Sequence, residues 1–169
     1  MIRIMLLIAA LLAVDVMAAP PQGAQGSNSQ IERQEWGPAV RGLQASVSLA
    51  TTVPTQGEPI TVQYRIRNIS GEPIKIVDAG FWPNHRIDVT TVDGMLVSRT
   101  TAGKDALRVF LSGERRKTVL RTLMPAEVLD DAQTITHFEL RSGVRYRLSI
   151  TYVEGSVELK SNQVEFTVR

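Results

Sequence analysis

One stretch near the C-terminus decides the fold class: VRYRLSITY, from Val144 to Tyr152. Every second side chain in it is aliphatic or aromatic, and the side chains between them are arginine, serine or threonine. Successive side chains of a strand point to opposite faces, whereas a helix repeats about every 3.6 residues. The stretch therefore predicts a strand with one buried face and one solvated face.

Three further segments alternate in the same way: Leu43–Leu49, Ile60–Arg67 and Val164–Val168. Turn-forming residues separate the apolar runs, among them Gly57-Glu58-Pro59 and Ser70-Gly71-Glu72-Pro73. Half-buried strands with such spacing are typical of antiparallel sheets that pack as a sandwich. The sequence predicts an all-β sandwich over residues 42–169.

Local patterns give four finer expectations. Asp93-Gly94 predicts a type I′ hairpin between strands at 87–92 and 95–98. The segment 135–140, which contains His137, predicts another strand, and the only helical turn is expected at 125–131. Tyr146 follows a turn glycine, so we expect a buried ring whose hydroxyl binds the backbone in a tyrosine corner.

The first 18 residues have the pattern of a cleaved secretory signal. Arg3 supplies positive charge, the run from Ile4 to Val14 is apolar, and Ala18 fits the cleavage position. A permanent span needs about 20 apolar residues, so no stable membrane anchor is expected after cleavage. Residues 19–41 are expected to form a flexible tether, with Trp36 fixing its end to the domain. The predicted location is periplasmic or extracellular.

Composition excludes several classes of protein. The chain has 169 residues and no cysteine, so it forms no disulfide, zinc–thiolate site or thiol nucleophile. Its formal net charge is +2, without a block of five or more like charges, so no nucleic-acid partner is expected.

Several motifs together resemble bacterial exported immunoglobulin-like domains, including those similar to the BsuPI type named for an intracellular proteinase inhibitor. The resemblance spans about 43–169 and implies an immunoglobulin-like antiparallel β-sandwich; at Pro125-Ala126-Glu127 the family usually has Pro-Gly-Glu. By analogy alone it also implies inhibition of a proteinase, without assigning residues to that activity. The motifs are Gly57–Ile60, Arg67–Ile74, Val92–Gly94, Phe138–Tyr146 and Ser161–Val168.

No catalytic, metal or cofactor motif is present. His85 and His137 are the only histidines, and a hydrolase would need one of them beside a serine and an aspartate. Asp78 and the pair Asp130-Asp131 lack the ligand spacing of a calcium loop, so turn or capping roles are expected. We therefore expect no catalytic residues, no bound metal and no cofactor.

The segment 78–86, DAGFWPNHR, holds the candidate binding residues. Aromatic and arginine side chains are enriched at recognition hot spots, although large rings also commonly pack inward and cap a core. The candidates are Phe81, Trp82, Asn84, His85 and Arg86.

The sequence favours a non-catalytic exported module that binds a protein or polysaccharide partner through end loops or a strand edge. A proteinase inhibitor of BsuPI-like type is the alternative. A small hydrolase and a structural envelope component are further hypotheses.

Overall fold

The computed structural model describes residues 35–112 and 118–169, so the predicted signal peptide and most of the predicted tether lie outside the described residues. The helices are α1 (Phe81–Asn84) and α2 (Thr101–Ser112). The strands are β1 (Leu43–Leu49), β2 (Ile60–Asn68), β3 (Ile74–Asp78), β4 (His85–Thr91), β5 (Val119–Leu123), β6 (Val128–Ile135), β7 (Arg145–Glu154), β8 (Val157–Lys160) and β9 (Val164–Thr167).

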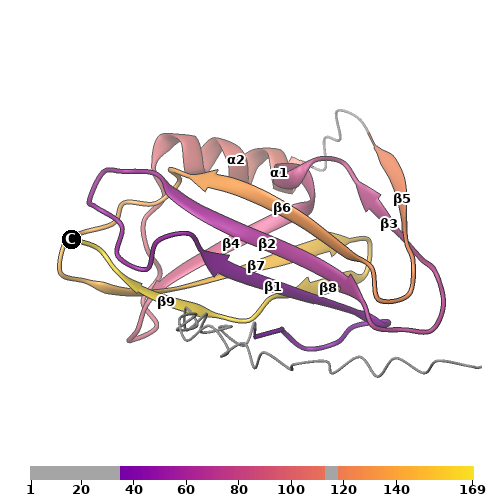
Figure 1. Ribbon diagram of the computed structural model, residues 1–169. Coiled ribbons are helices and arrows are strands. Elements are labelled where there is room, and N and C mark those ends of the chain that lie inside the picture. The colour runs from indigo at the N-terminus through magenta and orange to yellow at the C-terminus, as the bar shows by residue number, and fades with distance from the viewer. Residues whose placement is uncertain (1–34, 113–117) are drawn as a thin grey trace, which may run out of the picture. The chain divides into compact units, whose positions relative to one another are not determined.

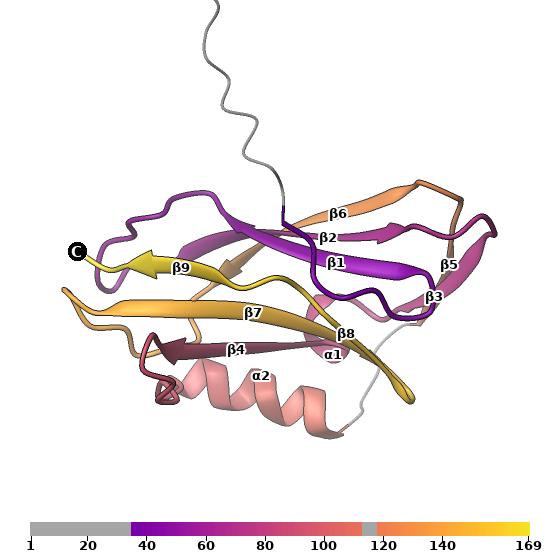
Figure 2. The ribbon, with the colours of Figure 1, turned by 90° about the horizontal axis from the view of Figure 1, so that it is seen from below.

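Two antiparallel sheets form the layers of a β-sandwich. One has the order β1-β2-β6, and in the other β7 pairs with β4 on one side and with β8 and β9 on the other. A short third sheet pairs β3 with β5 (Figure 1). Figure 2 shows the two layers edge-on, with α2 on the outer side of β4. The structure confirms the predicted fold class.

The alternating residues of the central strands form the core. Tyr64 on β2 is 2% exposed and Leu148 on β7 is fully buried, as the alternation requires. Arg65 and Arg147, their sequence neighbours, point to the opposite faces and pair with Asp130 and Glu165. Removing the apolar face from water is the main force that holds the layers together.

The tyrosine corner is present. Tyr146 is 2% exposed, and its hydroxyl accepts a hydrogen bond of 2.8 Å from the backbone N–H of Arg141. This bond fixes the entry into β7 and confirms the packing role expected from sequence.

A buried asparagine organises the turn between β2 and β3. The Nδ2 of Asn68 donates to the carbonyl oxygens of Glu72 (2.7 Å) and Leu123 (2.9 Å). Its Oδ1 accepts from the backbone N–H of Ser70 at 2.9 Å. One fully buried side chain therefore links the ends of β2 and β5 to the start of β3.

The helical turn predicted at 125–131 is wrong. Ala126 has a left-handed φ of 64°, and the backbone N–H of Glu127 donates to Met124 O at 3.0 Å, which closes a tight turn instead. β6 then begins at Val128 and pairs along β2. Long-range strand pairing supplies these backbone hydrogen bonds and overrides the local helix signal.

Helix α2 was not expected from sequence. Thr100 precedes it, and its Oγ1 accepts a hydrogen bond from the backbone N–H of Gly103 at 3.2 Å, in the manner of an N-cap. Gly103 is its one buried residue, because the backbone of His137 passes so close that a Cβ would lie 2.1 Å from that carbonyl oxygen. The glycine that weakens the helical pattern is therefore the residue that lets the helix dock.

Two other local expectations need correction. Asp93 does not have a positive φ, whereas Gly94 does, so β4 ends in a three-residue loop rather than a type I′ turn. The predicted partner strand 95–98 is reduced to a bridge between Thr90 and Leu96. The predicted strand 135–140 ends at Ile135, so His137 lies outside it.

The chain is already attached to the domain before β1. The Arg67 guanidinium lies 4.0 Å from the centroid of the Trp36 ring, and the backbone N–H of Gly37 donates to Ala45 O at 2.8 Å. Trp36 therefore has the anchoring role expected for it. Within the described residues, none of the helices combines the length and apolarity needed to cross a bilayer.

Candidate functional site

Several hollows open between the described elements, and two of them are compared as candidate sites. The first, here called the end pocket, has a volume of about 280 Å³ and lies where β2 begins and β6 ends. The second, here called the histidine cavity, has a volume of about 250 Å³ and lies between β2, β3, α1, β6 and β7. The histidine cavity receives part of the segment 78–86 singled out in the sequence.

Helix α1 is a single turn that is tied to the core by an amide. The Oδ1 of Asn84 accepts a hydrogen bond from the backbone N–H of Ala79 at 3.0 Å, and its Nδ2 donates to Val153 O at 3.4 Å. Asn84 is 1% exposed. Its side chain is therefore committed to internal bonds that position α1.

Phe81 also faces inward and is 7% exposed. Its ring stacks on the His85 imidazole, with centroids 4.4 Å apart and planes 9° apart, and it meets Tyr64 edge-on at 6.0 Å. Burial of Phe81 and Asn84 argues against a binding loop in which both make direct contact with a macromolecule. Their place is in the packing behind the cavity wall.

His85 has a defined tautomer. Its Nδ1 lies 2.7 Å from the carbonyl oxygen of Phe81, and a carbonyl can only accept, so Nδ1 carries the proton. Burial lowers the pKa of His85 to about 4, against smaller opposing effects of this hydrogen bond and of Asp78. The neutral ring therefore has Nε2 as an acceptor.

Two of the residues that line the cavity each hold a polar atom that is sealed from solvent and has no hydrogen-bond partner within the described part of the chain. These atoms are His85 Nε2 and Tyr64 Oη, both buried and unpaired among the described residues, as is Thr151 Oγ1 elsewhere. The rings of Tyr64 and His85 meet edge to face, with centroids 4.8 Å apart. Most buried polar side chains in proteins are paired, so these two atoms are exceptions within the packing of the domain.

Tyr152, which also lines the cavity, differs from Tyr64 because its hydroxyl has hydrogen-bond partners. Its Oη lies 2.8 Å from Val77 O and 2.6 Å from Glu154 Oε2. It also accepts a hydrogen bond of 3.1 Å from the backbone N–H of Val77. Tyr152 therefore holds β3 against β7, whereas Tyr64 is not used in this way.

Charged side chains surround the cavity on β3, β5 and β6. Asp131 is the register partner of Tyr64 and shares its face of the sheet; its Oδ2 accepts from Gln133 Nε2 at 2.9 Å. Asp78 and Arg121 are exposed, and Asp78 Oδ1 caps the N–H of Gly80 at 3.0 Å.

Asp130 also lines the cavity but is engaged elsewhere. It pairs with Arg65 at 3.0 Å and accepts a hydrogen bond from Gln63. Among the described residues no group of His, Cys, Asp and Glu has a metal-binding arrangement.

The other two candidates lie against α2 rather than in the cavity. Trp82 is half-buried and contacts the His137 ring at 4.1 Å between centroids. Arg86 is paired with Asp88 at 3.2 Å. The segment 78–86 is therefore divided: Phe81, Asn84 and His85 line the histidine cavity, and Trp82 and Arg86 line a shallow groove that His85 also touches.

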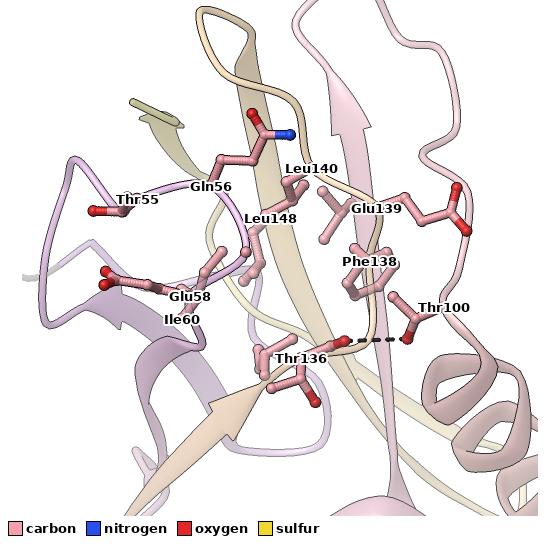
Figure 3. A pocket seen from close by; sticks show the side chains of 13 residues that line it. Thr55, Gln56, Glu58, Ile60, Thr100, Thr136, Phe138, Glu139, Leu140 and Leu148 are labelled. Carbon is pink, nitrogen blue, oxygen red and sulfur yellow. Dashed lines mark hydrogen bonds between the residues drawn. The ribbon is translucent and has the colours of Figure 1, made fainter.

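The end pocket has an apolar floor and a polar rim (Figure 3). Ile60, Phe138 and Leu148 line it between the layers. At its rim Thr100 Oγ1 donates to Thr136 O at 3.1 Å, and Gln56 Oε1 accepts from the N–H of Ser142 at 3.1 Å. None of the candidate binding residues of the segment 78–86 lines it, so the end pocket is the weaker candidate.

Sequence reasoning missed the residues that complete the histidine cavity. Tyr64 was recognised only as a core residue of a strand, and Asp131 only as a turn residue. A polar residue at an inward position of an alternating strand is the signal that marks Asp131, but it required the correct assignment of β6. Arg121 has no sequence signal that brings it to the histidine cavity.

Comparison with one solved structure supports the fold. The C-terminal domain of Wzt, known from a crystal structure, aligns with a TM-score of 0.50 and 16% identity over 82% of this chain and 83% of that chain. A CARDB domain from Pyrococcus furiosus, solved by NMR, aligns with a TM-score of 0.41 and 14% identity over 75% and 94%.

A β-glucosidase from Listeria innocua in complex with laminaribiose has a TM-score of 0.41 and 14% identity over 75% of this chain and 16% of the enzyme. No protein-family model matches the sequence, and none of the curated proteins matches it. The likeness to the Wzt domain shows a distant immunoglobulin-like β-sandwich.

Proposed function

We propose that this protein is an exported, non-catalytic immunoglobulin-like module that binds a protein or polysaccharide partner. The observation that carries the proposal is the histidine cavity, a hollow of about 250 Å³ whose lining includes Asp78, Arg121 and Asp131. A preformed concave site with a few convergent polar atoms is the usual form of a binding site.

The surroundings of the two histidines support a non-catalytic role. A general base is normally oriented by a carboxylate and lies beside a nucleophile. His85 instead holds a backbone carbonyl through Nδ1, and His137 Nδ1 accepts from the N–H of Thr136 at 3.2 Å. With its pKa lowered to about 4, His85 would also be a weak base.

Export rests on the sequence of the first 18 residues. Expression of the full chain followed by N-terminal sequencing of the secreted protein should give Ala19 as the first residue, within one position. Retention of unprocessed protein in the cytoplasm would contradict export.

Binding is tested with the purified protein immobilised and exposed separately to envelope polysaccharides and to envelope proteins. We expect saturable retention of one class without cleavage of it. Turnover of a retained polymer that is lost in His85→Ala or His137→Ala would overturn the non-catalytic role. Capture of a protease with loss of its activity would instead assign the inhibitor role implied by the BsuPI-like resemblance.

A further inference from the structure

Strand β5 has one edge without a neighbour in the described part of the chain, because it pairs only with β3 there. Its first four residues are all exposed, and Val119 and Leu120 are 50% and 67% exposed. In Figure 1 the β3–β5 pair lies at the right-hand end of the sandwich. An exposed apolar edge is a surface on which another strand can pair.

The contacts of Val77 on β3 show which backbone groups of β5 face this free edge. The N–H of Val77 donates to Tyr152 Oη at 3.1 Å, and its carbonyl oxygen accepts from the same hydroxyl at 2.8 Å. Both groups therefore point away from β5, so Val77 and its register partner Leu120 form a non-hydrogen-bonded pair. The N–H and C=O of Leu120 must then point away from β3. No described residue bonds to them.

The alternation of a strand extends this assignment to its neighbours. Backbone groups of successive residues point to opposite edges, so Thr118, Leu120 and Thr122 face the free edge, whereas Val119 and Arg121 bond to β3. Proline and lysine commonly prevent pairing at an exposed edge, and β5 contains neither. The edge is therefore open to a second strand.

We propose that two copies of this chain associate through β5, with the two strands antiparallel and Leu120 opposite the second copy's Leu120. This inference goes beyond the proposed binding function and does not depend on it. In this register each Thr118 lies opposite the other copy's Thr122, so the N–H and C=O groups that face the edge at these three positions find partners. The two leucine side chains, exposed in the single chain, would cover each other.

The charge of Arg121 favours this register and a second copy as the partner. Shifting one strand by two residues would place Arg121 opposite the second copy's Arg121, and like charges directly opposite are destabilising. In the proposed register Arg121 lies opposite the second copy's Val119, whose neighbour on β3 is Asp78. The Cα atoms of Arg121 and of the second copy's Asp78 are then two strand spacings, about 10 Å, apart on the same face of the joined sheet. Arg121 forms no ion pair with the described residues of its own chain, so the edge is complementary in charge to itself.

Disulfide trapping tests the register, because the chain has no cysteine and an introduced thiol reports on one position. The Cα atoms of a hydrogen-bonded antiparallel pair lie about 5.5 Å apart, within the range of roughly 4.4–6.8 Å that a disulfide spans. Leu120→Cys should therefore form a disulfide-linked dimer under mild oxidation at least tenfold faster than Leu96→Cys, which replaces an exposed leucine outside β5. Val119→Cys places its two Cα atoms about 8 Å apart and should link slowly.

Sedimentation velocity of the purified protein, from micromolar to millimolar concentration, measures the association itself. Leu120→Pro removes an N–H that faces the free edge, and proline is tolerated at such positions, so the ladder with β3 remains. We expect this variant to raise the dissociation constant of the dimer at least tenfold without changing the circular dichroism spectrum. Leu120→Thr keeps the N–H but loses the leucine contact, and should raise the constant by less. Leu96→Thr is the matched control and should associate like the wild type.

Several results would overturn this inference. One is a protein that stays monomeric up to millimolar concentration, and another is a Leu120→Cys variant that links no faster than Leu96→Cys. A dimer that Leu120→Pro leaves intact, or faster linking of Val119→Cys than of Leu120→Cys, would place the contact elsewhere. If Leu120→Pro does not fold, the cysteine variants still test the register. None of these results bears on the histidine cavity, so the proposed binding function is tested separately by the immobilised-protein assay.

Discussion

The imidazole of His85 lies flat on the ring of Phe81, and its Nδ1 binds the carbonyl oxygen of that same residue at 2.7 Å. The two residues belong to adjoining elements, α1 and β4, so the contact closes the helical turn onto the strand. It fixes the tautomer of His85 and leaves Nε2 as the acceptor nitrogen of the ring.

Stability should fall with acid through His85. The unfolded imidazole binds a proton near pH 6.5, whereas burial lowers the folded pKa to about 4. Between these values the unfolded state binds more protons, so the free energy of unfolding rises with pH. We expect His85 to contribute a loss of roughly 3 kcal/mol on going from neutral pH to about pH 4.

Urea unfolding at several pH values checks this contribution. Carboxylates also titrate in this range, so the measured quantity is the difference between the wild type and His85→Asn. The difference should change with pH between about 6.5 and 4. Parallel curves for the two proteins would show that His85 is not buried in its neutral form.

Tyr64→Phe and Tyr152→Phe should differ in their effect on stability. Tyr64 Oη has no hydrogen-bond partner in the part of the chain that the structure describes, so its removal is expected to change the free energy of unfolding by less than about 0.5 kcal/mol or to raise it. Removing Tyr152 Oη leaves Val77 and Glu154 without their shared partner and should cost about 1–3 kcal/mol. Equal losses for the two variants would contradict the assignment of Tyr64 as unpaired.

Gly103→Ala should destabilise the domain even though it lies in a helix. In an exposed helix this substitution gains about 1 kcal/mol. Here the new Cβ would lie 2.1 Å from the carbonyl oxygen of His137, so the helix must move, at a cost of about 1–3 kcal/mol or more. Gly71→Ala is the control, because its Cβ would meet no atom within 4 Å. Thermal unfolding of both variants and of the wild type measures the difference in stability. A Gly103→Ala variant that is more stable than the wild type would refute this docking of α2.

Disrupting the tyrosine corner is also expected to lower the stability of the domain. Tyr146→Phe removes the acceptor of the Arg141 N–H and should lower the free energy of unfolding by about 1 kcal/mol. Denaturant unfolding measures it. An unchanged midpoint would mean that water replaces the hydroxyl without cost.

The sequence identified the central strands because their apolar residues alternate, and the burial of β2 follows that alternation almost residue for residue. In β7 the apolar face is buried as predicted, but Ser149 and Thr151 on the face expected to be solvated are buried as well. Helix α2 could not be predicted from the sequence because most of its residues are exposed, so no apolar stripe marks it. Its docking depends on Gly103, which is needed because the backbone of His137 leaves no room for a Cβ. The site was only half visible. His85 was flagged by its neighbours in the chain, but Tyr64 and Asp131 reach it through pairing of β2 with β6, which no local pattern specifies.

The buried amide of Asn68 has a consequence for production of the protein. Asn68-Ile69-Ser70 matches the acceptor sequence for N-glycosylation, yet the side-chain nitrogen donates two internal hydrogen bonds and is sealed from solvent. A glycosylating host that modifies the nascent chain at this asparagine would attach a sugar where the finished turn has no room for one. Yeast or insect secretion should therefore yield misfolded, retained chains unless Ser70 is replaced, whereas a bacterial host avoids the problem.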